Sequence, residues 1–154
     1  MTQSSSSVMN DSRPMSREEI VAFFNRRQAA FDNLDADALA AGYASDCVVD
    51  SPSGGRHKGP QAVQEVMRAF FSAFLDMKLR VDRQLIDGNA VAQIVEVEGT
   101  QINEFMGLAP TGKPLRLVAA IDYELKGGKI VRERRIYDFT GMLVKVGVLK
   151  AKPA

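Results

Sequence analysis

The chain has 154 residues, of which 45% are hydrophobic and 25% are charged, a composition typical of one globular domain. Its 20 basic and 19 acidic side chains leave a net charge of +1, so charge gives no reason to expect a nucleic acid or an anionic membrane as partner. One cysteine, Cys47, and one histidine, His57, exclude an internal disulfide and a zinc site of the usual Cys/His kind. A magnesium or calcium site built from carboxylates alone stays open, but no motif for one is present.

Targeting signals are not evident in the sequence. No apolar run approaches the ~20 residues that span a bilayer, and the first residues lack the basic-then-apolar order of a signal peptide. We therefore expect a cytoplasmic protein without a membrane partner. Residues 1–15 are polar and rich in serine, which predicts a disordered leader. The predicted domain covers residues 16–149, and residues 150–154 form a short tail.

Three helices are predicted in the first half of the chain. Ser16 and Glu19 have the spacing of a capping box ahead of an apolar stripe that reaches Phe31. Asp35 can cap a second, shorter helix that runs through Leu39 to Tyr43. Pro60 suits the first turn of a third helix, whose apolar residues recur at helical spacing as far as Phe74. Between the last two, residues 47–49 read as a strand that ends at the turn of residues 51–55.

From residue 77 onward the hydrophobic period changes from helical to two. Strands are predicted at 78–86, 90–100, 115–125 and 129–139, separated by turns rich in glycine, proline and asparagine. Residues 141–147 can form a closing helical turn. Helices followed by antiparallel strands predict the α+β class.

This order of elements, with the segment Tyr43–Pro52 before the third helix, resembles the nuclear transport factor 2-like superfamily. More narrowly, residues 99–100, 104–113, 128–131 and 141–149 resemble the SnoaL-like polyketide cyclases. The resemblance covers about residues 16–149 and implies a cone, in which a curved mixed sheet and three N-terminal helices surround a pocket. The superfamily includes cyclases, ketosteroid isomerases, limonene epoxide hydrolases and non-catalytic binding or dimerising proteins, so the fold alone does not assign the chemistry.

The last hairpin predicts which side chains face that pocket. If Gly127 and Gly128 form a two-residue loop, the pairing partners in the two strands have numbers that sum to 255. The more apolar face, which we take as the pocket side, then carries Ile121 and Tyr123 on one strand and Arg134, Ile136 and Asp138 on the other. Asp122, Glu133 and Arg135 would form a charged outer face. A β-bulge would reverse one strand relative to the other.

Asp138 is the predicted catalytic residue. A carboxylate buried on an apolar strand face is costly unless it is paired or protonated, and burial raises its pKa toward the range useful for general acid–base catalysis. Asp138 also matches the position of the catalytic aspartate that the resemblance implies. The alternative is that Asp138 caps the C-terminal helical turn.

The other candidate site residues would bind the substrate. Arg134 can hold a carboxylate or an enolate oxygen, pair with Asp138, or extend to the pocket rim. Tyr123 can donate to the same oxyanion or simply pack in the core, and Ile136 and Gln93 would line the pocket. Asp50 lies either at the pocket mouth or in the turn before Pro52.

The comparison with relatives favours one kind of chemistry. Ser51 stands where ketosteroid isomerases place their base, and a second inward aspartate of the epoxide hydrolase kind is missing unless a bulge turns Asp122 inward. A single carboxylate suits a cyclase or isomerase that needs no cofactor and acts on a largely apolar, carbonyl-bearing small molecule. The alternatives are a non-catalytic ligand-binding protein and a dimerisation module. We expect a homodimer that uses the outer sheet face around Val118, Ala120 and Val131.

Overall fold

The computed structural model describes residues 13–150, so the predictions made for residues 1–12 and 151–154 lie outside the described residues. The elements in chain order are α1 (Arg17–Asp32), α2 (Ala36–Ala40), β1 (Tyr43–Ser51), β2 (Gly55–Lys58), α3 (Pro60–Ala73), β3 (Lys78–Asp87), β4 (Ala90–Thr100), β5 (Pro114–Lys126), β6 (Lys129–Ile136) and α4 (Phe139–Lys145). This order confirms the predicted α+β class.

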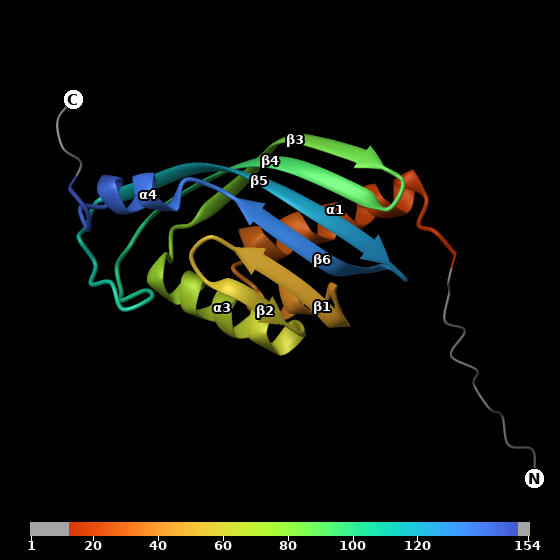
Figure 1. Ribbon diagram of the computed structural model, residues 1–154, viewed down its shortest axis with the longest axis horizontal. Coiled ribbons are helices and arrows are strands. Elements are labelled where there is room, and N and C mark those ends of the chain that lie inside the picture. The colour runs from red at the N-terminus through yellow and green to blue at the C-terminus, as the bar shows by residue number, and fades with distance from the viewer. Residues whose placement is uncertain (1–12, 151–154) are drawn as a thin grey trace, which may run out of the picture.

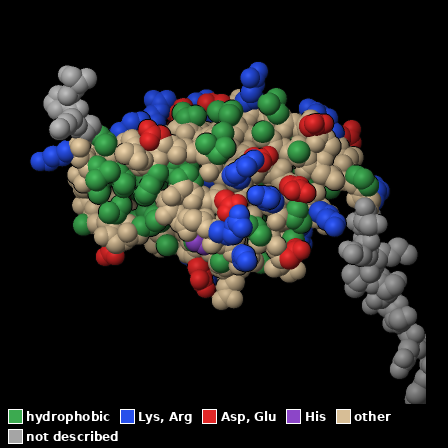
Figure 2. All heavy atoms as spheres, viewed as in Figure 1, with side chains coloured by type: hydrophobic (Ala, Val, Ile, Leu, Met, Phe, Trp, Pro, Cys, Tyr) green, Lys and Arg blue, Asp and Glu red, His purple; other side chains and the backbone are tan. Residues whose placement is uncertain are grey.

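The six strands form one curved, unclosed sheet in the order β2-β1-β6-β5-β4-β3 (Figure 1). Strand β1 runs parallel to β6, whereas the other neighbouring pairs are antiparallel, so the sheet is mixed. The apolar side chains of α1, α2 and α3 pack with those of the sheet in one hydrophobic core. We call the sheet face toward this core the inner face and the opposite face the outer face. Figure 2 views the molecule from the outer side.

Local signals in the sequence explain where the helices begin. Ser16 Oγ accepts a hydrogen bond from the Glu19 amide at 3.1 Å, and the Glu19 carboxylate accepts one from the Ser16 amide at 2.8 Å, which is the predicted capping box. Pro60 occupies the first turn of α3, where a missing amide hydrogen is harmless. The buried residues of α1 and α3 include the apolar residues at helical spacing, Phe24 among them.

Three boundaries differ from the prediction. Helix α2 ends at Ala40, because Tyr43 already begins strand β1. Residues 55–58 form the short edge strand β2, whose polar sequence shows none of the apolar alternation that marks a half-buried strand. His57 lies on this strand, opposite Val49, and is half buried. Strand β6 ends at Ile136, and the following residues lead into α4.

The predicted register of the last hairpin holds only next to its turn. Leu125 pairs with Ile130 as expected, but the register then shifts, and Tyr123 pairs with Glu133. This β-bulge turns Glu133 and Arg135 toward the inner face, so the prediction that they belong to the outer face is wrong. A one-residue slip moves every following side chain to the opposite side of a strand.

No helix within residues 13–150 is long and apolar enough to cross a membrane.

Candidate functional site

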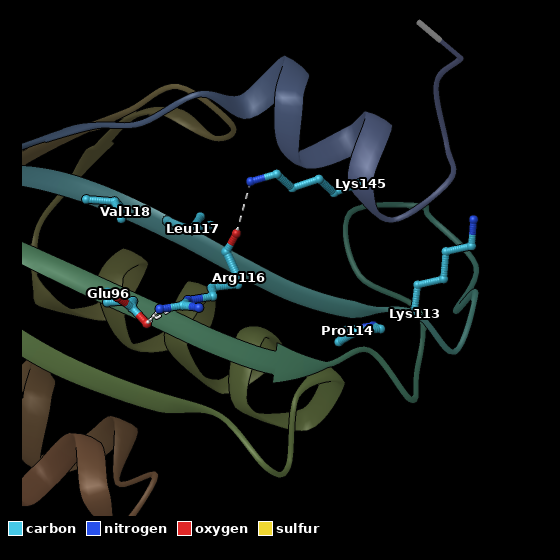
Figure 3. A pocket seen from close by; sticks show the side chains of 7 residues that line it. All are labelled: Glu96, Lys113, Pro114, Arg116, Leu117, Val118 and Lys145. Atoms are coloured by element: carbon cyan, nitrogen blue, oxygen red, sulfur yellow. Dashed lines mark hydrogen bonds and ion pairs between the residues drawn. The ribbon is translucent and has the colours of Figure 1, made fainter.

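Two hollows of very different kind are present. The first is an open groove of about 530 Å³ on the outer side, between α4 and β5, shown in Figure 3. The second is a cavity of only about 10 Å³ on the inner side, between α1 and strands β3–β5. The polar groups best placed for chemistry belong to the inner side.

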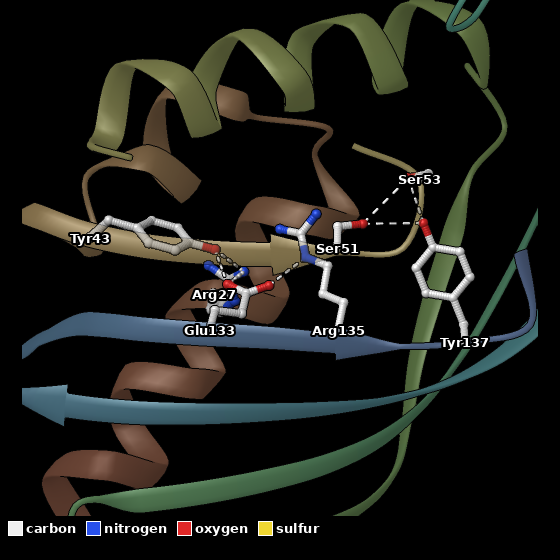
Figure 4. Close-up of polar contacts among 7 residues, drawn as sticks. All are labelled: Arg27, Tyr43, Ser51, Ser53, Glu133, Arg135 and Tyr137. Atoms are coloured by element: carbon white, nitrogen blue, oxygen red, sulfur yellow. Dashed lines mark hydrogen bonds and ion pairs between the residues drawn. The ribbon is translucent and has the colours of Figure 1, made fainter. Parts of the chain in front are cut away.

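A buried carboxylate, Glu133, organises the inner side of β6 (Figure 4). Arg135 Nε donates to Glu133 Oε1 at 2.6 Å. The hydroxyl group of Tyr43 donates to Glu133 Oε2 and itself accepts a hydrogen bond from Arg27 Nη2 at 2.7 Å. Arg27 Nη2 also lies 3.5 Å from Glu133 Oε2, which completes a network that joins α1, β1 and β6. Both oxygens of the carboxylate are therefore engaged.

Electrostatics keep Glu133 ionised although it is fully buried. Burial by itself would raise the pKa of this carboxyl, but the charges of Arg135 and Arg27 and the hydroxyl of Tyr43 outweigh it, so the pKa lies below its ordinary value. Burial also raises the pKa of Tyr123 to about 12, so this phenol stays protonated. The guanidinium of Arg27 lies 5.2–5.5 Å from the ring centroids of Phe31, Tyr43 and Tyr123, within the range of cation–π attraction.

A cluster of hydroxyl groups adjoins Arg135. The pairing of Asp50 with Arg134 in parallel strands places the next residues, Ser51 and Arg135, at neighbouring positions of β1 and β6. The Tyr137 hydroxyl donates to Ser53 Oγ at 2.6 Å, and Ser51 Oγ lies 3.3 Å from both of these oxygens. Figure 4 shows the Arg135 side chain extending from β6 toward Ser51. One cation and three hydroxyl groups thus gather at the end of β1.

The small inner cavity lies beside the other end of the network. Arg27, Gln93 and Tyr123 are among its lining residues, so the predicted inward orientation of Gln93 and Tyr123 is confirmed. Arg27 Nε is the only buried side-chain nitrogen or oxygen atom of residues 13–150 without a hydrogen-bond partner. The side chain of Gln93 does not serve as that partner, because its Nε2 donates to Gln84 Oε1 at 2.7 Å.

Asp138 lies at the N-cap of α4 and is exposed. Its Oδ1 accepts a hydrogen bond from the Gly141 amide at 2.8 Å, which is the capping contact that the sequence offered as the alternative. The prediction that Asp138 faces the interior is wrong, because the bulge reverses β6 and the strand ends two residues earlier. Its catalytic role stays a prediction.

Three other candidates lie on the outer side, Arg134 and Ile136 because of the same bulge and Asp50 because it follows the inward Val49 on β1. Ile136 is 56% exposed, and Arg134 forms an ion pair with Asp122 at 3.0 Å, so the prediction that the two face inward is wrong. Asp50 receives a hydrogen bond from Arg56 Nε at 2.8 Å, which holds the pKa of the Asp50 carboxyl below its ordinary value. Asp50 is therefore part of an outer ion pair. Neither Arg27 nor Glu133 is among the site residues predicted from the sequence. Arg27 stands in the apolar stripe of α1, four residues after Phe23 and four before Phe31, which is a signal for a buried charge, whereas β6 is mostly charged and gives no local signal for Glu133.

Comparison with known proteins gives the family. The model of the SnoaL-like polyketide cyclase family matches residues 10–145. The chain belongs to this family. None of the curated proteins matches the chain.

Solved structures place this SnoaL-like chain among proteins of the same fold. AclR from Streptomyces galilaeus, a candidate hydroxylase, is 25% identical with a TM-score of 0.77, and the match covers 90% of this chain and 87% of AclR. IdmH from Streptomyces antibioticus, a candidate polyketide cyclase, is 26% identical with a TM-score of 0.69 over 83% of this chain and 98% of IdmH. An epoxide hydrolase of the LEH-like kind from M. tuberculosis is 17% identical with a TM-score of 0.67, over 84% of this chain and 90% of that one, and shows the fold alone.

Proposed function

We propose that this SnoaL-like chain is a cofactor-independent cyclase or isomerase that acts on a largely apolar, carbonyl-bearing small molecule. The observation that carries the proposal is the inward side chain of Arg135, whose Nε donates to Glu133 and whose strand lies beside the end of β1, where the hydroxyl groups of Ser51, Ser53 and Tyr137 lie within hydrogen-bond distance of one another. Positioned N–H and O–H donors stabilise a carbonyl oxygen as it gains negative charge in an enolate. Half-buried apolar side chains at the edge of the core, such as Phe70 and Leu117, suit the apolar part of such a molecule.

We assign different tasks to the two carboxylates Glu133 and Asp138. Glu133 is a positioning residue, because both of its oxygens already accept hydrogen bonds and its charge fixes Arg135. Asp138 is the proposed proton acceptor: it follows Tyr137 directly, and only one of its oxygens serves as helix cap. In the reaction Asp138 takes the proton from the carbon next to the carbonyl, and the pair of electrons moves to the oxygen held by Arg135. Because Asp138 is exposed, the proton that it has taken exchanges with water. In an isomerisation a proton from Asp138 then goes to another carbon, whereas in a ring closure the enolate carbon attacks a second carbonyl carbon and the proton goes to the resulting alkoxide.

A second candidate function is ligand binding without catalysis. The interior favours this candidate because it offers no free carboxylate to accept a proton. Glu133 is the only buried acidic side chain of residues 13–150, and both of its oxygens already accept hydrogen bonds. An interior in which the proton acceptor is absent can still bind a carbonyl compound through Arg135.

Exchange of protons with deuterium tests the proposal without knowledge of the natural substrate. A panel of apolar ketones and β-keto esters is incubated with the protein in heavy water, and loss of the α-proton signal is followed by NMR. We expect exchange that depends on the protein and that Asp138→Asn slows by about 10²–10⁴-fold, the usual contribution of a general base. Asn is also a good helix cap, so α4 stays in place. Arg135→Gln should slow exchange as well, and the exposed Glu124→Gln is the matched control.

One outcome decides against catalysis, and two others decide against the residues assigned to it. Binding of a panel compound without exchange would favour the non-catalytic candidate. Exchange that is unchanged in Asp138→Asn would remove Asp138 from the mechanism, and exchange unchanged in Arg135→Gln would remove the proposed oxyanion site.

A further inference from the structure

The connection between β4 and β5 is a structured loop. Within residues 101–113, which we call the β4–β5 loop, the amides of Phe105 and Leu108 each donate to the other residue's carbonyl oxygen, at 3.1 and 2.9 Å. The two residues between them, Met106 and Gly107, have φ angles of 52° and 75°. A positive φ is ordinary for glycine but costly for methionine, and residues held in this way cluster at ligand clamps and switches. Long loops in compact domains also usually serve a function.

One aromatic ring joins this loop to the C-terminal end of α3. The ring centroid of Phe105 lies 5.4 Å from that of Phe70 and 5.8 Å from that of Phe74, within the range of favourable aromatic pairs. Phe105 is half buried and packs against the hydrophobic core, whereas the neighbouring Met106 is 48% exposed. The loop thus adds a single ring to the edge of the core.

Few polar contacts hold the loop against α3. The side chain of Asn103 and the amide of Ile102 each donate to a carbonyl oxygen at the C-terminal end of the helix, both at 2.8 Å. The buried side chain of Gln101 ties the loop to itself, because its Nε2 donates to the carbonyl oxygens of Asn103 and Leu108. The small hairpin can therefore move away from α3 as one piece when two hydrogen bonds and the ring contacts break.

The loop lies at the same end of the molecule as the proposed substrate site. Figure 1 shows the β4–β5 loop, α4 and the C-terminal end of α3 together at the end toward which β1 and β6 run. Ser51 is the last residue of β1 and Tyr137 follows the last residue of β6, so the hydroxyl cluster belongs to this end. A ligand that enters the inner side from this end meets the β4–β5 loop.

The inner side offers little space while the loop is in this position. The cavity between α1 and strands β3–β5 measures about 10 Å³, which is about the room that one water molecule needs. Sites for small organic molecules occupy about 300–1,000 Å³, so a ligand of the proposed kind needs further space. The loop can give it at low cost, because residues 101–113 are not paired into the sheet and local opening is easiest where few contacts are lost.

We propose that the β4–β5 loop is a flap over the inner side and that the apolar part of a ligand takes the place of Phe105 against Phe70 and Phe74. The inference rests on the proposed function, because it says how the substrate of that site enters and where its apolar part binds. With the flap closed, Phe105 competes with the ligand for the same contacts. The apparent affinity is then the intrinsic affinity reduced by the fraction of molecules whose flap is open.

Binding of prodan, a fluorescent and largely apolar naphthyl ketone, tests the flap without turnover. Phe105→Ala removes the competing ring and should tighten binding about 10-fold, because two aromatic contacts are lost from the closed state. Asn103→Ala removes one hydrogen bond between the loop and α3 and should tighten binding by about 2–10-fold. Met106→Ala, on the same hairpin but exposed, is the matched control and should bind prodan as the wild type does.

A double variant and hydrogen exchange show where the ligand binds. In the Phe105→Ala background, Phe70→Ala should weaken prodan binding by about 5-fold or more, because the ligand loses one of its own aromatic contacts. Prodan should speed the exchange of the Ile102 amide in the wild type, since this amide is hydrogen-bonded to α3 only while the flap is closed. Near-ultraviolet circular dichroism checks that each variant is folded, and Asn103→Ala decides alone if Phe105→Ala does not fold.

Three results overturn the flap. They are equal affinity of the wild type and the two loop variants Phe105→Ala and Asn103→Ala, slower exchange of the Ile102 amide with prodan, and the absence of prodan binding to every variant. The proposed function fails separately. Binding of prodan that follows the expected order without exchange of its α-protons in heavy water would remove catalysis and leave the flap in place.

Discussion

Glu133→Gln is the substitution that most directly tests the buried network. Glutamine keeps the size and shape of glutamate, so no cavity forms, but the negative charge between Arg27 and Arg135 is lost. The side chains of these arginines are only 7% and 19% exposed, so water cannot replace the missing charge. Removing one partner of a buried ion pair costs about 3–5 kcal/mol, because the remaining charge stays buried without compensation. Here two cations share one anion, so we expect a value in that range.

Such a loss is large against the total stability of a domain, which is typically about 5–15 kcal/mol. For a chain of this length it corresponds to a fall in Tm of roughly 6–20 °C. The assay is urea unfolding followed by circular dichroism, with thermal unfolding as a second measurement. Glu124→Gln removes an exposed carboxylate from the same hairpin and should change the free energy of unfolding by less than about 0.5 kcal/mol.

A matched double variant separates the ion pair from simple packing. Arg135→Gln combined with Glu133→Gln leaves one fewer unpaired cation, so the two substitutions should cost less together than the sum of their separate costs. A free energy of unfolding of Glu133→Gln within about 1 kcal/mol of the wild-type value would show that the charge of Glu133 is not needed between the two arginines. Strict additivity of the two substitutions would contradict the pairing as well.

Two further predictions concern stability. Since the pKa of Glu133 is lower in the folded chain than its ordinary value of 4.5, its stabilising contribution is fully present above that pH and is lost as the pH falls through the folded pKa. Unfolding titrations between roughly pH 7 and pH 3 should show a steeper loss of stability in the wild type than in Glu133→Gln, and parallel profiles would contradict the assignment. Ser16→Ala removes the cap of α1 and should lower the free energy of unfolding by about 0.5–2 kcal/mol, whereas Ser16→Asp should keep the cap and the stability. Urea unfolding measures both variants. Equal stability of Ser16→Ala and the wild type would show that the capping box contributes nothing.

The sequence by itself determined the elements whose signals are local. The capping box at Ser16, the proline at the start of α3 and the period-two strands depend on neighbouring residues. The capping box and the proline lie where predicted, and so do the strands, except that β6 ends at Ile136. The inward orientation of Tyr123 follows from alternation within a single strand. The family and the mixed sheet also agree with the resemblance carried by segments along the chain.

The tertiary structure decided which side of the last strand meets the core. The bulge after Ile130 in β6 depends on how this strand fits between β5 and β1, and no residue of the preceding turn predicts it. Because the side-chain period of a strand is two, this one extra residue places Glu133 and Arg135 on the inner face, where Arg134 and Ile136 were predicted. The buried network became visible only then, since Arg27, Tyr43 and Glu133 come from three elements that the fold brings together.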